Sequence, residues 1–123
     1  MGRMSLKEFK DVPFNSYDKI KIYIAGPMRG YENLNHEAFD LAEKKLNKGL
    51  VYDPVNPAKM DRAFGLDSSI DMTQEELKDA LRRDVDAIFE SDALYMLRGW
   101  ERSEGARMEH ALALALGMSI HYE

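Results

Sequence analysis

Two carboxylates in the second half of the chain, Asp84 and Glu109, have positions that suit chemistry at a carbon centre. Glu109 lies in the first turns of a predicted helix, just before an apolar stretch, and the helix dipole there favours its ionised form. An ionised carboxylate that faces a cleft can attack an electrophilic carbon. A solvent-exposed helix glutamate fits the same position, so both interpretations stay open at this point.

Asp84 and Asp92 flank the end of the preceding predicted helix. Two carboxylates can share acid and nucleophile duties, as in the hydrolysis of glycosides. Asp86 and Glu90 lie in the same stretch and weaken this signal, because charge-rich helix faces are common. Asp92 also opens a predicted strand, away from the strand's carboxyl end, so we expect a structural role for it.

The loop Gly26-Pro27-Met28-Arg29-Gly30 lies between a predicted strand and a predicted helix. Glycines there let backbone N–H groups approach an anion, and the helix start adds partial positive charge. Arg29 could complete a phosphate site. The patterns G-x-G-x-x-G and G-x-x-x-x-G-K-[ST] are both absent, which leaves dinucleotide and P-loop sites unsupported. A plain turn with a surface arginine fits the same residues.

Tyr23 belongs to an apolar run and is expected in the core, although its hydroxyl lies near the carboxyl end of a strand. His36, His110 and His121 show no metal-ligand spacing, and the motif H-E-x-x-H is absent. We therefore expect no metal, and chemistry carried by two carboxylates needs no organic cofactor.

Strands and helices that alternate along the chain carry these residues. Short β-branched or aromatic runs predict strands, and apolar residues at helical spacing predict helices. A capping box at residues 73–76 begins a helix that ends near residue 89. The other expected elements are strands at 20–25, 50–52, 93–97 and 118–121, a helix capped by Asn33 or Asn35 and ended by Gly49, and a helix from Glu104 to Leu116.

This alternation predicts a single Rossmann-like (flavodoxin-like) α/β domain, with a parallel sheet of about four or five strands and helices on both faces. Residues 19–123 form the domain, and residues 1–18 are expected to be a partly flexible extension. Ligands of such sheets bind at the carboxyl ends of the strands, which points to loops at 26–33, 53–72 and 98–103. Residues 56–72 have no clean period and predict a long loop. The second half of the last helix is almost wholly apolar, and we expect it to be buried.

The composition excludes several classes of protein. The chain has 123 residues, enough for one domain, and no cysteine, so it has neither disulfides nor thiolate metal sites. A formal net charge of −5 argues against binding to a nucleic-acid polymer. No apolar run approaches the roughly 20 residues that span a bilayer, and the first residues lack a signal-peptide core. We expect a cytoplasmic protein.

Four segments occur in order and with matching gaps. They are Tyr23-Ile24-Ala25-Gly26-Pro27-Met28-Arg29-Gly30, Arg83-Asp84, Ser91-Asp92-Ala93 and Ser103-Glu104-Gly105-Ala106-Arg107-Met108-Glu109. As a set they resemble the nucleoside 2-deoxyribosyltransferase superfamily, which includes the deoxyribosyltransferases and the 2′-deoxynucleoside 5′-monophosphate N-glycosidases. An uncharacterised branch common in bacteria and phages is more similar still, because it shares Gly99-Trp100-Glu101-Arg102-Ser103. The resemblance covers about residues 19–121.

The resemblance implies a role for each matching residue. Glu109 matches the nucleophile that forms a covalent glycosyl-enzyme with C1′, and Asp84 matches the aspartate that contacts the base and helps to protonate it. Tyr23 matches the tyrosine that orients the nucleophile. The implied substrate-binding residues are Gly26, Pro27, Met28, Arg29, Gly30, Ser103 and Gly105.

Ser103 favours a nucleotide over a nucleoside as the ligand. The transferases have an aspartate at this position that binds the 5′ side of the sugar, and the monophosphate hydrolases have a serine. A carboxylate beside a phosphate dianion is repelled, whereas a serine hydroxyl donates to it. Pro27 departs from the hydrolases, which often have serine there, and it lacks both the N–H and the hydroxyl.

These observations predict an N-glycosidase that hydrolyses a nucleoside 5′-monophosphate through a covalent glycosyl-Glu109 intermediate, with a homodimer or higher homo-oligomer as its assembly. A deoxyribosyltransferase that exchanges bases is one alternative. A non-catalytic nucleotide-binding module is another, and it would need Arg29 and Ser103 but not Glu109. In the transferases the C-terminal tail reaches into a neighbouring subunit's site. The short C-terminus of this chain leaves little tail to do so.

Overall fold

The computed structural model describes residues 19–66 and 72–123. The predicted flexible extension at residues 1–18 lies outside the described residues. The order of elements is β1 (Ile20–Ala25), η1 (Glu32–Asn35), α2 (His36–Leu46), β2 (Tyr52–Val55), α3 (Pro57–Ala63), α4 (Gln74–Phe89), β3 (Ala93–Met96), η2 (Trp100–Arg102), α5 (Glu104–Ala115) and β4 (Ser119–Tyr122).

The four strands form one parallel sheet in the order β2-β1-β3-β4. The predicted Rossmann-like α/β domain is therefore confirmed, and the order is that of the first four strands of a flavodoxin-like sheet. The chain adds β2 on one side of β1 and then crosses over to add β3 and β4 on the other side, so the direction of strand addition reverses between β1 and β3. The carboxyl ends of these two central strands are where such folds bind ligands.

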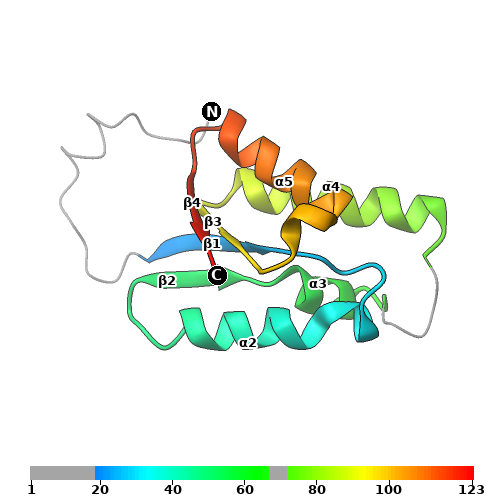
Figure 1. The fold of residues 1–123 in the computed structure, drawn as a ribbon, viewed down its shortest axis with the longest axis horizontal. Helices are drawn as coiled ribbons and strands as arrows, with labels where there is room; N and C mark the ends of the chain where they lie inside the picture. Colours follow the sequence, from blue (N-terminus) through cyan, green and yellow to red (C-terminus); the bar gives the residue numbers. More distant parts are fainter. Residues whose placement is uncertain (1–18, 67–71) are drawn as a thin grey trace.

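Alternate residues of β1 enter the two layers of the core. Ile22 and Ile24 pack with Phe39 and Ala58 beneath α2 and α3. Tyr23 points to the opposite face, where the core includes residues of α4 and α5. Figure 1 shows α2 and α3 on one side of the sheet and α4 and α5 on the other. Side chains of β1 alternate because strands have a period of two residues, so Tyr23 faces α5.

The second strand begins later than the sequence predicts. Leu50 and Val51, which were expected in it, are 81% and 53% exposed. Pairing starts where Ile20 meets Tyr52, and the strand runs on through Pro54. Pro54 is tolerated because β2 is an edge strand of the sheet. On its outer side no neighbouring strand needs a backbone N–H, which proline lacks.

The predicted long loop at 56–72 is wrong in its first half, which forms helix α3. The side chain of Asn56 accepts a hydrogen bond from the N–H of Ala58 at 3.0 Å, and Pro57 occupies the first helical turn. An asparagine cap followed by proline is a helix-start signal that the absence of a clean apolar period obscured.

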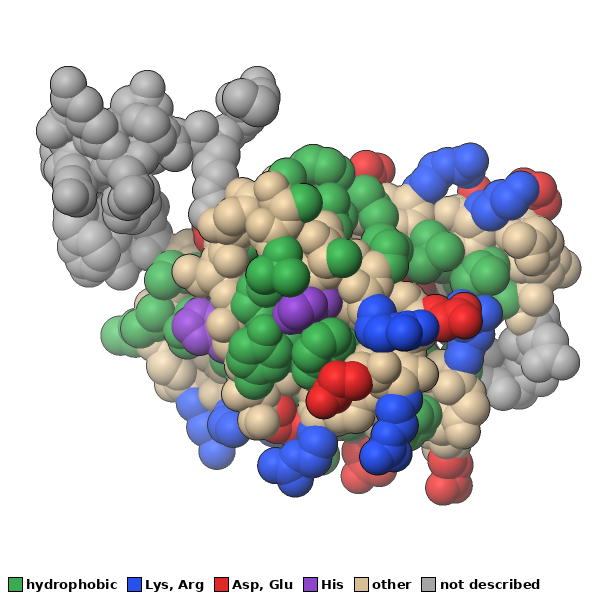
Figure 2. Space-filling model, turned by 45° about the horizontal axis from the view of Figure 1, so that its top comes forward, with side chains coloured by type: hydrophobic (Ala, Val, Ile, Leu, Met, Phe, Trp, Pro, Cys, Tyr) green, Lys and Arg blue, Asp and Glu red, His purple; other side chains and the backbone are tan. Residues whose placement is uncertain are grey.

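The predicted burial of the second half of α5 is also wrong in the single chain. Ala113 is buried, whereas Leu114 is 61% exposed. Figure 2 shows hydrophobic side chains gathered on the face of the molecule that carries this helix. Within residues 19–66 and 72–123, no helix is both long and apolar enough to cross a membrane.

Candidate active site

Tyr23 and Glu109 meet in the interior between β1 and α5. The Tyr23 hydroxyl donates a hydrogen bond to Oε2 of Glu109 at 2.6 Å, and both side chains are buried. Glu109 lies in the second turn of α5, on the face that packs against the sheet together with Ala106 and Ala113. The solvent-exposed interpretation of Glu109 is therefore excluded. A short bond from a hydroxyl to a carboxylate is the strong, charge-assisted kind.

Asp84 of α4 lines the same cavity as Tyr23 and Glu109. Its Oδ1 atom is buried and has no hydrogen-bond partner in the structure. The helix begins at the predicted capping box, in which Thr73 and Glu76 exchange hydrogen bonds of 3.1 and 2.9 Å. This cap sets the start of the helix, and Asp84 follows about three turns later on the side that faces the sheet.

The two carboxyls hold protons more tightly than ordinary acidic side chains. Burial and then the charge of Asp84 raise the pKa of Glu109 to about 8, against the opposing effect of the Tyr23 hydrogen bond. Burial and the charge of Asp61 raise the pKa of Asp84 to about 7, against the opposing effects of Arg83 and Tyr23. Carboxyls that share a desolvated cavity titrate as a unit, because ionising one disfavours ionising the other.

A third buried carboxyl, Asp61, lines the cavity and was missed by the sequence analysis. It lies on α3, the helix that the sequence did not predict. Asn56 at the start of α3 donates to Asp40 and Glu43 of α2 at 2.9 and 3.0 Å. Arg62 of α3 also pairs with Asp40 at 3.0 Å. These bonds fasten α3 to α2 and so fix the position of Asp61.

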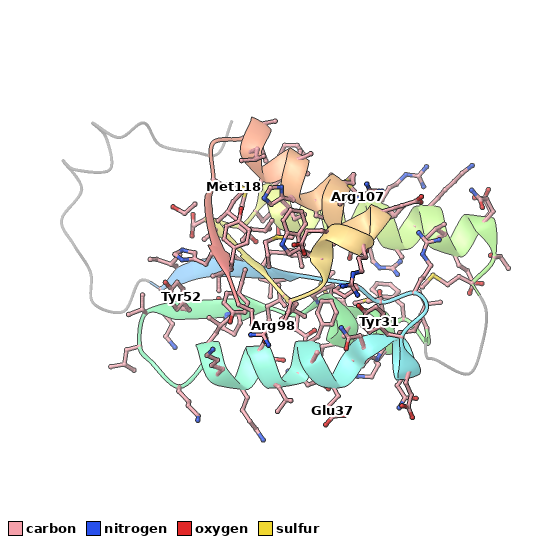
Figure 3. The ribbon with its side chains drawn as sticks, in the orientation of Figure 1. Tyr31, Glu37, Tyr52, Arg98, Arg107 and Met118 are labelled. Atoms are coloured by element: carbon pink, nitrogen blue, oxygen red, sulfur yellow. The ribbon has the colours of Figure 1, made fainter. Side chains whose placement is uncertain are left out.

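The start of α5 forms a polar end of the cavity. Ser103 is the helix cap, and its Oγ accepts a hydrogen bond from the N–H of Ala106 at 3.1 Å. The hydroxyl hydrogen of Ser103 stays available as a donor, and N–H groups in the first helical turn lack acceptors within the helix. Gly105 lines the cavity beside Ser103. In Figure 3 the first turns of α5, marked by Arg107, face the loop after β1, marked by Tyr31.

The predicted anion-binding loop contributes only some of its residues. Gly26, Met28 and Arg29 line the cavity, and Arg29 is exposed at its mouth. Pro27 and Gly30 are not part of the lining. Pro27 is buried, and its carbonyl accepts a hydrogen bond from Asn35 at 2.9 Å, which ties the loop to the start of α2.

Gly26 has a packing reason to be glycine. A Cβ atom at this position would lie 2.7 Å from the Cβ of Leu97, a distance that real side chains do not reach. The glycine therefore permits the loops after β1 and β3 to approach one another closely. That approach brings the loop after β1 next to the start of α5.

The rest of the cavity is mostly apolar. The apolar side chains come from the loop after β1, from η1, α2, α3 and α4, and from the residue that precedes the cap of α4. The apolar residues of the lining include Met28, Leu34, Phe39, Pro57, Met72, Leu77, Ala80 and Leu81. An apolar wall with a few convergent polar groups is the usual character of a small-molecule site.

Other candidates from the sequence lie elsewhere. Asp92 accepts a hydrogen bond from the N–H of Lys21 at 3.0 Å, which fits the structural role expected for it. His110 stacks on Trp100 with ring centroids 4.2 Å apart, and its Nε2 lies 2.8 Å from the Tyr122 hydroxyl. Within residues 19–66 and 72–123, no group of three or more histidine, aspartate or glutamate side chains is arranged to hold a metal ion.

The model of a domain of unknown function, DUF4406, matches residues 20–122. The chain belongs to the DUF4406 family. The match runs from β1 to β4, so every residue that lines the cavity of this DUF4406 protein lies within it. No curated protein and no solved structure matches the chain.

Proposed function

We propose that this DUF4406 protein is an N-glycosidase that hydrolyses the bond between base and sugar in a nucleoside 5′-monophosphate. The observation that carries the proposal is the 2.6 Å hydrogen bond from Tyr23 to Glu109, in a cavity that also contains Asp84. A carboxylate oriented by a fixed donor, with a second carboxyl of raised pKa nearby, is the pair that glycoside hydrolysis requires. The resemblance to the deoxyribosyltransferase superfamily supports the same assignment.

The reaction needs one proton shared between the two carboxyls. With pKa values of about 7 for Asp84 and about 8 for Glu109, the pair holds at least one proton at neutral pH. Because the pKa of Glu109 is the higher of the two, that proton lies first on Glu109, and the attacking state needs it on Asp84 with the anion on Glu109. The Tyr23 bond favours the Glu109 anion, and positive charge that develops at C1′ favours it further. The second carboxyl then serves as the acid.

The reaction proceeds in two steps. In the first, the Glu109 carboxylate forms a bond to C1′ while the C1′–N bond breaks, its electron pair leaves with the base, and Asp84 gives the base a proton. In the second, water attacks C1′, the ester bond to Glu109 breaks, and the proton of the water passes to the Asp84 carboxylate. The products are the free base and the sugar 5-phosphate.

The two ends of the cavity suit the two ends of a nucleotide. Ser103 can donate its hydroxyl hydrogen to a phosphate at the start of α5, where the helix dipole favours an anion. Arg29 can add a charge-assisted hydrogen bond from the mouth. The apolar side chains of α4, with Leu77 and Leu81 among them, offer a surface to the flat face of the base.

The test is incubation of the protein with a panel of ribo- and 2′-deoxyribonucleoside 5′-monophosphates, with chromatographic detection of free base. We expect release from at least one substrate and no measurable release by Glu109→Gln, which keeps the shape but not the anion. Glu104→Gln, an exposed substitution on the same helix, is the control and should keep wild-type turnover. Base release that survives Glu109→Gln, or none from any nucleotide, would contradict the proposal.

A further inference from the structure

Asp61 is a buried carboxyl for which the proposed reaction has no use. Its side chain is 5% exposed, and its Oδ1 atom has no hydrogen-bond partner in the structure although it lines the cavity. A buried polar atom without a partner costs free energy, so its persistence calls for an explanation such as a ligand group. The Oδ1 atom of Asp84, which lines the same cavity, is also buried without a hydrogen-bond partner.

Arg83 forms a long ion pair with Asp61 but no hydrogen bond. Its Nη2 lies 4.0 Å from Oδ1 of Asp61, which is beyond hydrogen-bond distance, and its guanidinium stacks over the ring of Phe64 at 4.0 Å. Burial raises the pKa of Asp61, and the charges of Arg83 and Arg62 oppose this shift. Asp61 thus keeps an acceptor atom whose hydrogen bond is not made within the protein.

Asp61 and Asp84 influence each other, since the charge of Asp61 raises the pKa of Asp84. When Asp61 is ionised, its charge therefore helps Asp84 to keep its proton. The cavity then offers one donor, the Asp84 carboxyl, and one acceptor, the Asp61 carboxylate. A purine with a 6-amino group presents the complementary edge, because its N7 accepts and its amino group donates. A 6-oxo purine presents two acceptors there, and its O6 would be repelled by the anion.

We propose that Asp61 determines base specificity, and that together with Asp84 it selects 6-aminopurine nucleotides over 6-oxopurine nucleotides. The inference rests on the proposed function for the role of Asp84 as the acid at N7 of the base. It adds the class of substrate, which neither the catalytic pair nor the phosphate end of the cavity specifies.

The test compares adenosine with inosine 5′-monophosphate, each as the ribo and the 2′-deoxy form. We expect wild-type kcat/KM to favour the amino compound by at least roughly tenfold, the effect of one hydrogen bond to a charged group. Asp61→Asn replaces an acceptor with an amide that can also donate to O6, so it should remove or reverse the preference. Asp53→Asn, an exposed substitution on β2, is the matched control and should keep the wild-type ratio.

A second readout separates this inference from the proposed function. Binding of the same nucleotides to Glu109→Gln, measured by calorimetry, should show the same preference for the amino compound, and adding Asp61→Asn should remove it. An amino preference in binding without base release would leave the role of Asp61 intact and overturn the glycosidase. Equal losses for both bases in Asp61→Asn, or no binding of either, would overturn the assignment of Asp61.

Discussion

The hydroxyl of Tyr23 and the carboxylate of Glu109 are joined by a 2.6 Å hydrogen bond across 86 positions of sequence. One residue comes from the first strand and the other from the last helix, and the sheet holds them together. A donor to the carboxylate favours its ionised form, which is the form that can attack.

Removal of this donor should slow the reaction without disturbing substrate binding to the same degree. Tyr23→Phe deletes a hydrogen bond to a charged group, which is worth about 1.5–3 kcal/mol, so kcat should fall roughly tenfold to a hundredfold. The pKa of Glu109 should rise as well. Tyr95→Phe, at another buried sheet tyrosine outside the cavity lining, is the control. Unchanged kcat in Tyr23→Phe would show that the hydroxyl does not orient the nucleophile.

Asp84→Asn should reduce base release through loss of the acid. General acid catalysis contributes typically about 10²–10⁴-fold, and kcat should fall within that range. Substrates whose leaving group departs readily without a proton, such as nitrophenyl glycosides of ribose 5-phosphate, should show a much smaller fall in kcat. Asp86→Asn, at an exposed position of the same helix, should behave as wild type. An equal fall in kcat for both kinds of leaving group would show that Asp84 is not the acid.

The raised pKa values of Asp84 and Glu109 predict how stability depends on pH. The folded protein binds more protons than the unfolded chain between the ordinary carboxyl pKa and about pH 8, so the free energy of unfolding should fall as pH rises through this window. Urea unfolding at pH 5.5 and pH 8.5 measures the difference. Glu109→Gln should reduce this difference in stability, because the variant loses one titrating carboxyl and removes the charge coupling to Asp84. A wild-type protein more stable at the higher pH would refute the assigned shifts.

Ser103→Asp tests the proposed phosphate end of the cavity. Aspartate also caps helices well, so α5 should start unchanged while a negative charge replaces a donor. KM for a nucleoside 5′-monophosphate should rise by at least roughly tenfold, because the new carboxylate repels the dianion. The matching nucleoside should be spared, since its 5′-hydroxyl can donate to the carboxylate. Equal losses for nucleotide and nucleoside would indicate that Ser103 only supports the helix start.

The exposed apolar surface of α5 predicts self-association. Leu114 and Met108 are 61% and 36% exposed, and contiguous apolar surface on a small domain commonly lies between subunits. Sedimentation at micromolar concentration should show a homodimer or a higher oligomer. Leu114→Glu should shift it to the monomer, whereas Leu41→Glu, at an equally exposed position on α2, should not. A monomeric wild-type protein would contradict this prediction.

Much of the fold follows from local signals in the sequence. The β-branched run at residues 20–25 and the capping box at Thr73 predicted β1 and the start of α4 correctly, since both depend on neighbouring residues alone. Helix α3 was missed because its apolar period is weak, and its position depends on bonds from Asn56 and Arg62 to α2. The start of β2 was misplaced because pairing with β1, which local hydrophobicity does not reveal, decides it.

The sequence by itself determined the alternation of strands and helices, the DUF4406 match and the identity of Tyr23, Asp84 and Glu109 as candidates. Only the tertiary structure decided that Glu109 is buried against Tyr23, and that Pro27 and Gly30 lie outside the cavity lining. Only the structure also brought Asp61 to the same cavity. The physical reason is that burial and charge proximity arise between elements distant in sequence. They set the pKa values on which the proposed chemistry depends, whereas periodicity and caps act within a few residues.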